Sequence, residues 1–243
     1  MKLTQGEKSE RSRSLILEAA LQLFSKQGYR GTSIREIAEA AGLSTGNVYH
    51  HFPDKEALFR TLLDQYWEAI DTPEFPFNKA LAAGAFPDDL EALAEAARES
   101  VTAYRRHVAL IYVDVVEFDG THIRKFYSGM SGRFETFLSR RFPDGQLKDQ
   151  LAPGLDPTTA LMLASRVFLQ YFAVEVLFGV PDQLGQETPA ALKEISKILR
   201  RGFLRSPEPG NYHPGLLRAC PPAGGPGALP GGPAAGPRGG TSG

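Results

Sequence analysis

The chain has 243 residues, 42% of them hydrophobic and 23% charged, and its formal net charge is −1. These values are typical of a globular protein of one or two domains, and they exclude a strongly cationic chain that would bind any polyanion. The single cysteine, Cys220, excludes an intrachain disulfide and favours a reducing, cytoplasmic location.

Apolar residues recur with helical spacing along most of the sequence, which predicts an all-α fold. Residues 1–10 are expected to form a flexible basic N-terminus. The first predicted helix covers residues 11–27 and ends at Gly28. The second begins at Ser33, because Ser33 and Glu36 have the spacing of a capping box, in which each side chain bonds a backbone N–H at the start of the helix.

Two further helices are predicted in the N-terminal part of the chain. Gly42-Leu43-Ser44 indicates a tight turn, and a short helix follows over residues 45–51. Phe52-Pro53-Asp54 interrupts the chain again and starts a fourth helix, with an apolar stripe that reaches Tyr66. Residues 11–71 are therefore expected to fold as a head of three to four helices.

Proline and glycine mark residues 72–87 as a linker at the start of the C-terminal helical domain, residues 72–205. Asp156-Pro157 and Thr188-Pro189 each place a capping residue before a proline, an arrangement that opens a helix. The helices predicted in this block cover residues 88–106, 107–118, 121–142, 157–178 and 188–205. Residues 206–243 hold eleven glycines and nine prolines in 38 positions, too little apolar surface to offset the entropy of ordering, so a disordered tail is expected.

Residues 33–52 combine two short amphipathic helices with a glycine turn, which predicts a helix-turn-helix whose second helix enters the major groove of DNA. That helix has one clearly apolar residue, Val48, so most of its hydroxyl, amide, phenol and imidazole groups can face bases and phosphates. Residues 1–60 carry nine Lys and Arg against seven Asp and Glu, whereas residues 61–205 carry sixteen against twenty. The N-terminal part is therefore the one suited to phosphates.

A longer pattern runs through the four N-terminal helices. It consists of Ala19-Ala20, Leu23-Phe24, Gly28-Tyr29, Thr32-Ser33-Ile34, Ile37-Ala38, Ala41-Gly42, Gly46-Asn47-Val48-Tyr49, His51-Phe52, Lys55-Glu56 and Leu58. This pattern resembles the DNA-binding domain of the TetR/AcrR family of transcriptional regulators. The resemblance covers residues 11–66, and the remainder of the chain is similar only in being a helical block of suitable length.

The resemblance implies a sequence-specific, homodimeric transcriptional regulator that binds double-stranded DNA at a palindromic operator. It further implies a repressor that leaves the operator when a small hydrophobic effector binds the C-terminal domain. Arg11 and Arg13 are additional candidates for contacts to the DNA backbone or minor groove. The residues implied to bind DNA are Thr32, Ser33, Arg35, Ser44, Thr45, Gly46, Asn47, Tyr49, His50 and Lys55.

The C-terminal block is expected to bind the effector and to form the dimer. Residues 157–178 are apolar on nearly every side, which favours a helix that packs within its own domain and also against a second chain. The alternative is a helix that is simply central. Arg166, Gln170 and Glu175 interrupt the apolar run, so a membrane span is not expected. The aromatic residues assigned to the effector pocket are Tyr104, Phe118, Phe126, Tyr127, Phe168, Tyr171 and Phe172.

No catalytic device is recognisable in the sequence, so we expect neither an enzyme nor a cofactor. Adjacent His50 and His51 do not share a helix face, which argues against a metal site, and His51 is interpreted as structural. Two other classes of protein stay open. One is an enzyme or carrier built on a helical bundle with an incidental helix-turn-helix, and the other is an adaptor that uses the tail.

Several ionisable residues of the C-terminal block are given ordinary roles. Asp114, Glu117 and Asp119 are interpreted as surface charge, with a polar group in a ligand pocket as the alternative. His107 and His122 are interpreted as residues at helix ends.

Overall fold

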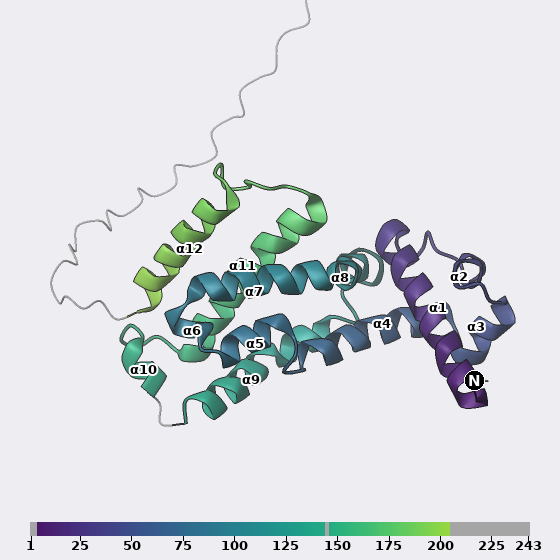
Figure 1. Cartoon of the computed structure of the whole chain (residues 1–243), viewed down its shortest axis with the longest axis horizontal. Helices are drawn as coiled ribbons and strands as arrows, with labels where there is room; N and C mark the ends of the chain where they lie inside the picture. The colour runs from purple at the N-terminus through teal and green to yellow at the C-terminus, as the bar shows by residue number, and fades with distance from the viewer. Residues whose placement is uncertain (1–3, 144–145, 205–243) are drawn as a thin grey trace, which may run out of the picture. The chain divides into compact units, whose positions relative to one another are not determined.

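The computed structural model describes residues 4–143 and 146–204 (Figure 1). Over these residues the chain forms twelve α-helices and no β-strand, which confirms the all-α prediction. The buried hydrophobic side chains form two clusters, one in the head and one in the C-terminal domain. The predicted disordered tail, residues 206–243, lies outside the described residues.

Four helices build the head, and each begins after a residue whose side chain accepts a hydrogen bond from the first turn: Thr4, Ser33, Ser44 and Asp54. The helices are α1 (Gln5–Gln27), α2 (Ile34–Ala41), α3 (Thr45–His51) and α4 (Lys55–Ile70). Such caps satisfy N–H groups that have no acceptor within the helix. The predicted bounds of α3 and the predicted start of α2 are confirmed.

The start of α1 was predicted too late. The helix begins at Gln5, because Thr4 and Glu7 form a capping box of their own. Residues 5–10 are therefore helical, and the expectation of a flexible segment is wrong for them. The expectation of a basic segment is wrong as well, since Lys8 is flanked by Glu7 and Glu10.

The head is closed around a core to which all four helices contribute. Phe24 and Phe59 pack edge to face with ring centroids 5.5 Å apart. Val48 is the one buried residue of α3, as predicted, so this helix is anchored at a single point. The fully buried residues of the head core include Ile16, Ala20, Phe24, Ile37, Val48, Leu58 and Phe59.

The C-terminal domain contains α5 (Pro76–Ala82), α6 (Ala85–Asp88), α7 (Leu90–Ala103), α8 (Arg105–Phe118), α9 (Arg124–Arg141), α10 (Gln146–Gln150), α11 (Pro157–Phe178) and α12 (Thr188–Phe203). The predicted linker holds two of these helices. Its aromatic residues Phe75, Phe77 and Phe86 are buried in the C-terminal core. The free energy of burying them stabilises a folded segment where proline and glycine alone predict a linker. Thr188 is the first residue of α12 and not its cap, because its hydroxyl donates to Glu175 at 2.6 Å.

Helix α11 occupies the middle of the C-terminal domain and packs against α7, α8 and α9. By length and composition alone, this helix could also cross a membrane. Of its most apolar 18-residue segment, 39% is buried inside the structure. The buried face includes Ala160, Ala164, Phe168 and Phe172. Small residues at two of these positions let the neighbouring helix approach closely, as expected for a central helix of a packed domain.

Candidate DNA interface and effector cavity

Helix α3 presents most of its polar side chains to the outside. The Tyr49 side chain is 56% exposed, and His50, Thr45 and Gly46 are exposed as well. Ser44 caps the helix by accepting a hydrogen bond from the Asn47 N–H at 3.2 Å. This arrangement leaves hydroxyl, phenol and imidazole groups accessible to a groove of DNA, as the sequence predicts.

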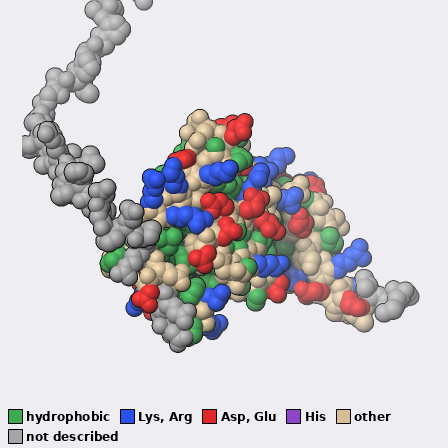
Figure 2. Space-filling model, turned by 60° about the vertical axis from the view of Figure 1, so that its left-hand side comes forward, with side chains coloured by type: hydrophobic (Ala, Val, Ile, Leu, Met, Phe, Trp, Pro, Cys, Tyr) green, Lys and Arg blue, Asp and Glu red, His purple; other side chains and the backbone are tan. Residues whose placement is uncertain are grey.

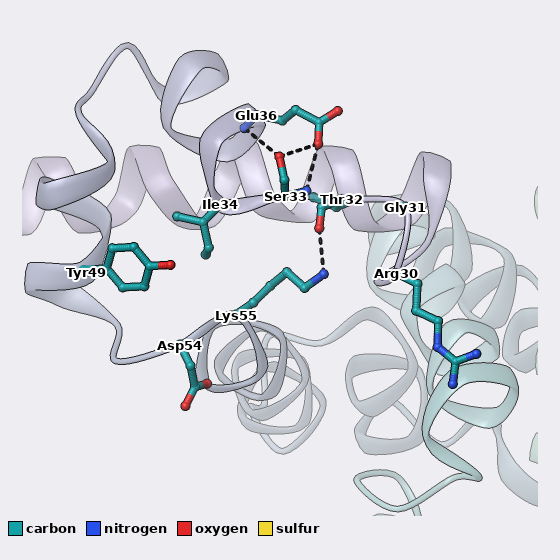
Figure 3. A pocket seen from close by; sticks show the side chains of 9 residues that line it. All are labelled: Arg30, Gly31, Thr32, Ser33, Ile34, Glu36, Tyr49, Asp54 and Lys55. Carbon is teal, nitrogen blue, oxygen red and sulfur yellow. Dashed lines mark hydrogen bonds between the residues drawn. The ribbon is translucent and has the colours of Figure 1, made fainter.

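A hollow of about 430 Å³ lies beside α3, at the N-terminus of α2 (Figure 3). In this view Lys55 extends from α4 toward the backbone at Thr32, and the Tyr49 ring lies beside Ile34. The first N–H groups of α2, those of Ile34 and Arg35, have no acceptor within their helix and so suit an anion. The lining residues are Arg30, Gly31, Thr32, Ser33, Ile34, Glu36, Tyr49, Asp54 and Lys55.

The hydroxyl groups of Thr32 and Ser33 are already engaged within the head. Thr32 is almost completely buried, and its hydroxyl donates to the Gly28 carbonyl at 2.7 Å. Both the Ser33 hydroxyl and the Ser33 N–H donate to the Glu36 carboxylate, at 2.7 and 2.8 Å. In this structure neither hydroxyl donates outward, so neither is free to donate to a phosphate as the sequence predicts.

Lys55 holds the turn between α1 and α2 in place. Its Nζ donates to the carbonyl oxygens of Tyr29 and Thr32, at 2.8 and 2.7 Å, and lies 4.1 Å from the centre of the Tyr29 ring. Burial lowers the pKa of Lys55, and the carboxylates of Glu117 and Glu36 oppose that shift. Two of the three ammonium donors are used internally, which leaves one for the predicted contact with a phosphate.

The remaining candidates in the head are divided between surface and core edge. The Arg35 side chain is 83% exposed and lies 3.8 Å from Glu39. The Arg13 guanidinium lies over the Phe52 ring at 5.2 Å, which gives it a packing role. His51 is half-buried, and burial lowers its pKa, in agreement with its interpretation as structural.

Glu117, in the last turn of α8, joins the C-terminal domain to the head. Its two carboxylate oxygens accept hydrogen bonds from the N–H groups of Tyr29 and Arg30, at 2.8 and 2.6 Å. The Glu117 side chain is 14% exposed. The interpretation as surface charge is therefore wrong for this residue, because its carboxylate is mostly buried and binds the turn between α1 and α2.

Asp114 and His122 also belong to this junction. The interpretation as surface charge is wrong for Asp114, whereas His122 lies just before α9, at a helix end as predicted. Asp114 is fully buried and accepts hydrogen bonds from His122 and from the Ile123 N–H. The second ring nitrogen of His122 lies 3.5 Å from Glu56 of α4. Phe118 stacks on Phe59 with centroids 5.1 Å apart, so it belongs to the head contact and not to the effector pocket.

A cavity of about 1390 Å³ opens in the C-terminal domain between α4, α5, α7, α8, α9 and α11. Two of the seven aromatic residues predicted for a pocket line it, Phe126 and Tyr127. Phe168 and Phe172 are fully buried in the core, Tyr104 packs beside Tyr66, and Tyr171 lies near Thr188. The aromatic lining that sequence reasoning missed is Tyr66, Trp67, Phe75, Phe77, Tyr112, Phe134 and Phe137.

Helix α8 connects this cavity to the head. Ile111, Tyr112 and Val115 line the cavity, and Glu117 at the end of the same helix holds the turn at residues 29–30. In Figure 1 the end of α8 lies next to α1, and α8 packs on both α1 and α4. A displacement of the α8 backbone at the cavity would therefore reach the turn at residues 29–30, which precedes α2.

Charged side chains of both signs are mixed over the face shown in Figure 2, which carries no single field of positive charge. Within the described residues, no group of three or more His, Cys, Asp and Glu side chains is placed to hold a metal ion. The candidate functions of the described residues thus concentrate at α3 with its hollow and at the C-terminal cavity.

Comparison with known proteins finds a family model that matches the head and curated relatives that match over stretches of different length. Residues 16–62 match the family model described as "Bacterial regulatory proteins, tetR family". The chain is 45% identical over 62 residues to the HTH-type transcriptional repressor AcnR of Corynebacterium glutamicum, covering 26% of this chain and 33% of AcnR. It is 29% identical over 166 residues to the repressor NicS of Pseudomonas putida, covering 66% and 76%.

Similarity to solved structures extends over both parts of the fold. NalD, the secondary repressor of the MexAB-OprM multidrug efflux pump in Pseudomonas aeruginosa, matches with a TM-score of 0.55 at 24% identity, over 82% of this chain and 99% of NalD. At this identity the match shows the fold alone. The chain spans about a third of the length of the first curated relatives, since the matches cover 30% of YuxN of Bacillus subtilis and 33% of AcnR.

Proposed function

The chain belongs to the TetR family of bacterial regulatory proteins, and we propose that it is a sequence-specific DNA-binding repressor of transcription. The family is one of regulators and not of enzymes. The observation that carries the proposal is α3, a seven-residue helix held by one buried residue, Val48, with its polar groups outward. A protein with this role acts in the cytoplasm, where its DNA is.

In the proposed complex α3 lies in the major groove. Tyr49, His50 and Thr45 face base edges and phosphates from the exposed side of the helix. The N–H groups at the start of α2 and the remaining donor of Lys55 face a phosphate in the hollow of Figure 3. The side-chain oxygen of Asn47 is buried and has no hydrogen-bond partner among the described residues, so it does not face the groove in this structure.

A homodimer would present two such heads to the two halves of a palindrome. The support is a set of large apolar side chains left exposed on and between the last two long helices. Several large apolar residues exposed on successive helices favour association with another chain. They are Leu163, Phe178, Val180, Leu184 and Ile198. We propose that α11 and α12 pair with the same helices of a second copy as a four-helix interface.

The proposed effector is a small hydrophobic molecule that occupies the C-terminal cavity and weakens DNA binding. Apolar and aromatic side chains dominate the cavity lining, which favours such a ligand. The contact from Glu117 to the N–H groups of Tyr29 and Arg30 supplies a route from the cavity to the head. Bound ligand then lowers the affinity for DNA, and bound DNA lowers the affinity for the ligand by the same factor.

Selection from a pool of random duplex DNA tests the proposal. We expect the purified chain to enrich a palindrome, and Tyr49→Ala to lose that enrichment while keeping the melting temperature of the wild type, because the side chain is exposed. Lys79→Ala, which alters an exposed residue of α5 outside the proposed dimer interface, serves as the control and should enrich the same sequence. The absence of any enriched sequence with the wild-type chain would contradict the proposal.

A further inference from the structure

The end of α4 is joined to α9 by four side chains of the cavity wall, which we name the α4–α9 clasp: Trp67, Asp71, Phe126 and Arg133. The rings of Trp67 and Phe126 are stacked, with centroids 3.9 Å apart and an interplanar angle of 12°. Arg133 lies over the other side of this stack, 4.9 Å from the Phe126 ring, and donates to Asp71 at 2.8 Å. Asp71 is the C-terminal capping residue of α4.

The wall of the cavity carries more positive than negative charge. Among the lining residues, Asp71 is the one acidic side chain beside three arginines, Arg133, Arg140 and Arg166. Arg133 and Arg140 are seven residues apart on α9 and so lie on the same side of that helix. Arg166 of α11 lies near Tyr127, where its charge opposes the rise that burial causes in the pKa of Tyr127. An apolar wall with excess cationic groups suits a ligand with a negative head.

We infer that the cavity takes an amphipathic anion, a molecule with an apolar body and a carboxylate or similar head that pairs with Arg133 in place of Asp71. The Arg133–Asp71 pair is partly exposed, at 40% and 55%, so it is weak and easily exchanged. A ligand carboxylate held inside the cavity would instead accept paired N–H donors away from bulk water. A neutral ligand of the same shape lacks this gain.

When the ligand carboxylate replaces Asp71 as the partner of Arg133, the end of α4 would also be released from α9. That this release regulates DNA binding rests on the proposed repressor function. Without Asp71 bound to Arg133, the end of α4 keeps only the Trp67–Phe126 stack as its connection to α9 within the clasp. The other end of α4 carries Lys55, which holds the carbonyl groups of residues 29 and 32. An anionic head group would thus act on one end of the helix whose other end holds the turn before α2.

Tryptophan fluorescence measures binding to the clasp directly, because Trp67 is the only tryptophan in the chain. The full chain is titrated with decanoate, decanol and decyltrimethylammonium, each below its micelle concentration and without DNA. We expect decanoate to change the Trp67 emission and to bind at least about tenfold more tightly than decanol. A tenfold difference in affinity is what one additional charge-assisted hydrogen bond contributes. The cation should bind most weakly.

Two variants separate ligand recognition from simple loss of the ion pair. Arg133→Gln and Asp71→Asn both break the pair, so a purely structural role would change decanoate binding in the same direction. Here Arg133→Gln should abolish the preference for decanoate over decanol, whereas Asp71→Asn should strengthen decanoate binding because a competing carboxylate is gone. Arg141→Gln, on the same helix but outside the cavity lining, is the control and should keep the wild-type preference.

Equal binding of decanoate and decanol, a preference that survives Arg133→Gln, or no response of Trp67 to any of the three compounds would each overturn the inference. These outcomes are independent of the proposed function, because no DNA is present. A chain that prefers decanoate but selects no DNA sequence would contradict the repressor proposal and leave the inference standing.

Discussion

The head and the C-terminal domain differ in how their helices are stabilised at their starts. Each of α1 to α4 begins at a residue whose own side chain caps the helix, and two of these caps are complete capping boxes. In the C-terminal domain α5, α6, α8, α9 and α12 have no side-chain cap. Local sequence therefore defines the helices of the head, whereas distant contacts define most helices of the C-terminal domain.

The interiors of the head and of the C-terminal domain also differ. The head core is filled by fully buried side chains such as Phe24 and Phe59, whereas the C-terminal domain keeps a cavity of about 1390 Å³. A filled core with capped helices moves as a unit, since any internal shift breaks close packing. A domain with a cavity can repack around a ligand. The difference suggests that the head transmits a displacement and that the C-terminal domain generates it.

The largest expected effect comes from removing an aromatic ring in each region. Phe59→Ala deletes a fully buried ring of the head and should cost about 3–5 kcal/mol of unfolding free energy, because it leaves a cavity in a closed core. Phe134→Ala deletes a half-buried ring that lines the existing cavity and should cost less. Urea unfolding measures both, and equal losses would remove the distinction between the two interiors.

Glu117→Gln tests the connection between the regions. The NH2 group that replaces one carboxylate oxygen cannot accept a hydrogen bond, so one of the two N–H groups loses its acceptor and the change should cost about 1.5–3 kcal/mol locally. Amide hydrogen exchange at Tyr29 and Arg30 should become faster, with little change at Ile37 in the head core. Glu135→Gln on the exposed side of α9 is the control. Unchanged exchange at residues 29 and 30 would argue against the link.

Arg35→Ala tests whether the exposed charge of the head contacts DNA. Loss of one phosphate contact should weaken binding to the selected palindrome and reduce the slope of log affinity against log salt by about 0.9. Lys79→Ala removes an exposed charge of the same sign from α5 and should leave the slope unchanged. A similar change of slope in both variants would show only a general effect of net charge.

The smallest expected effect is a pH dependence at His107, which stacks on Tyr66 with centroids 5.6 Å apart. Burial lowers the pKa of His107 from its ordinary 6.5. The unfolded chain then binds this proton more tightly than the folded chain, so stability falls as the pH drops below 6.5 toward the folded pKa and is unaffected above that range. His107→Gln should reduce the loss of melting temperature between about pH 7.5 and 5.5. An identical loss in the variant would exclude this residue as a cause.

What the sequence predicts follows the same division between regions. The start of α2 and both ends of α3 depend on residues close in sequence, such as Ser33 with Glu36, and they are predicted correctly. The start of α1 was encoded in the same way, by Thr4 with Glu7, and was overlooked. Glu117 could not be assigned in advance, because its partners lie 88 and 87 residues earlier in the chain.

The cavity lining was the least predictable part of the molecule. Aromatic content identifies a helical domain rich in large side chains, but it does not say which ring faces a cavity and which faces the core. Phe168 and Phe172 on α11 are core residues, whereas Trp67 lines the cavity from α4, a helix assigned to the head by its sequence pattern. The tertiary packing of each helix decides this, and no local pattern encodes that packing.

The coupling of the two regions is the central claim, and a pair of affinities tests it most directly. The affinity for the selected palindrome is measured with and without saturating decanoate, and the affinity for decanoate is measured with and without the palindrome. The account predicts that decanoate weakens DNA binding and that DNA weakens decanoate binding by the same factor. Decanoate that binds at Trp67 yet leaves the DNA affinity unchanged would contradict it.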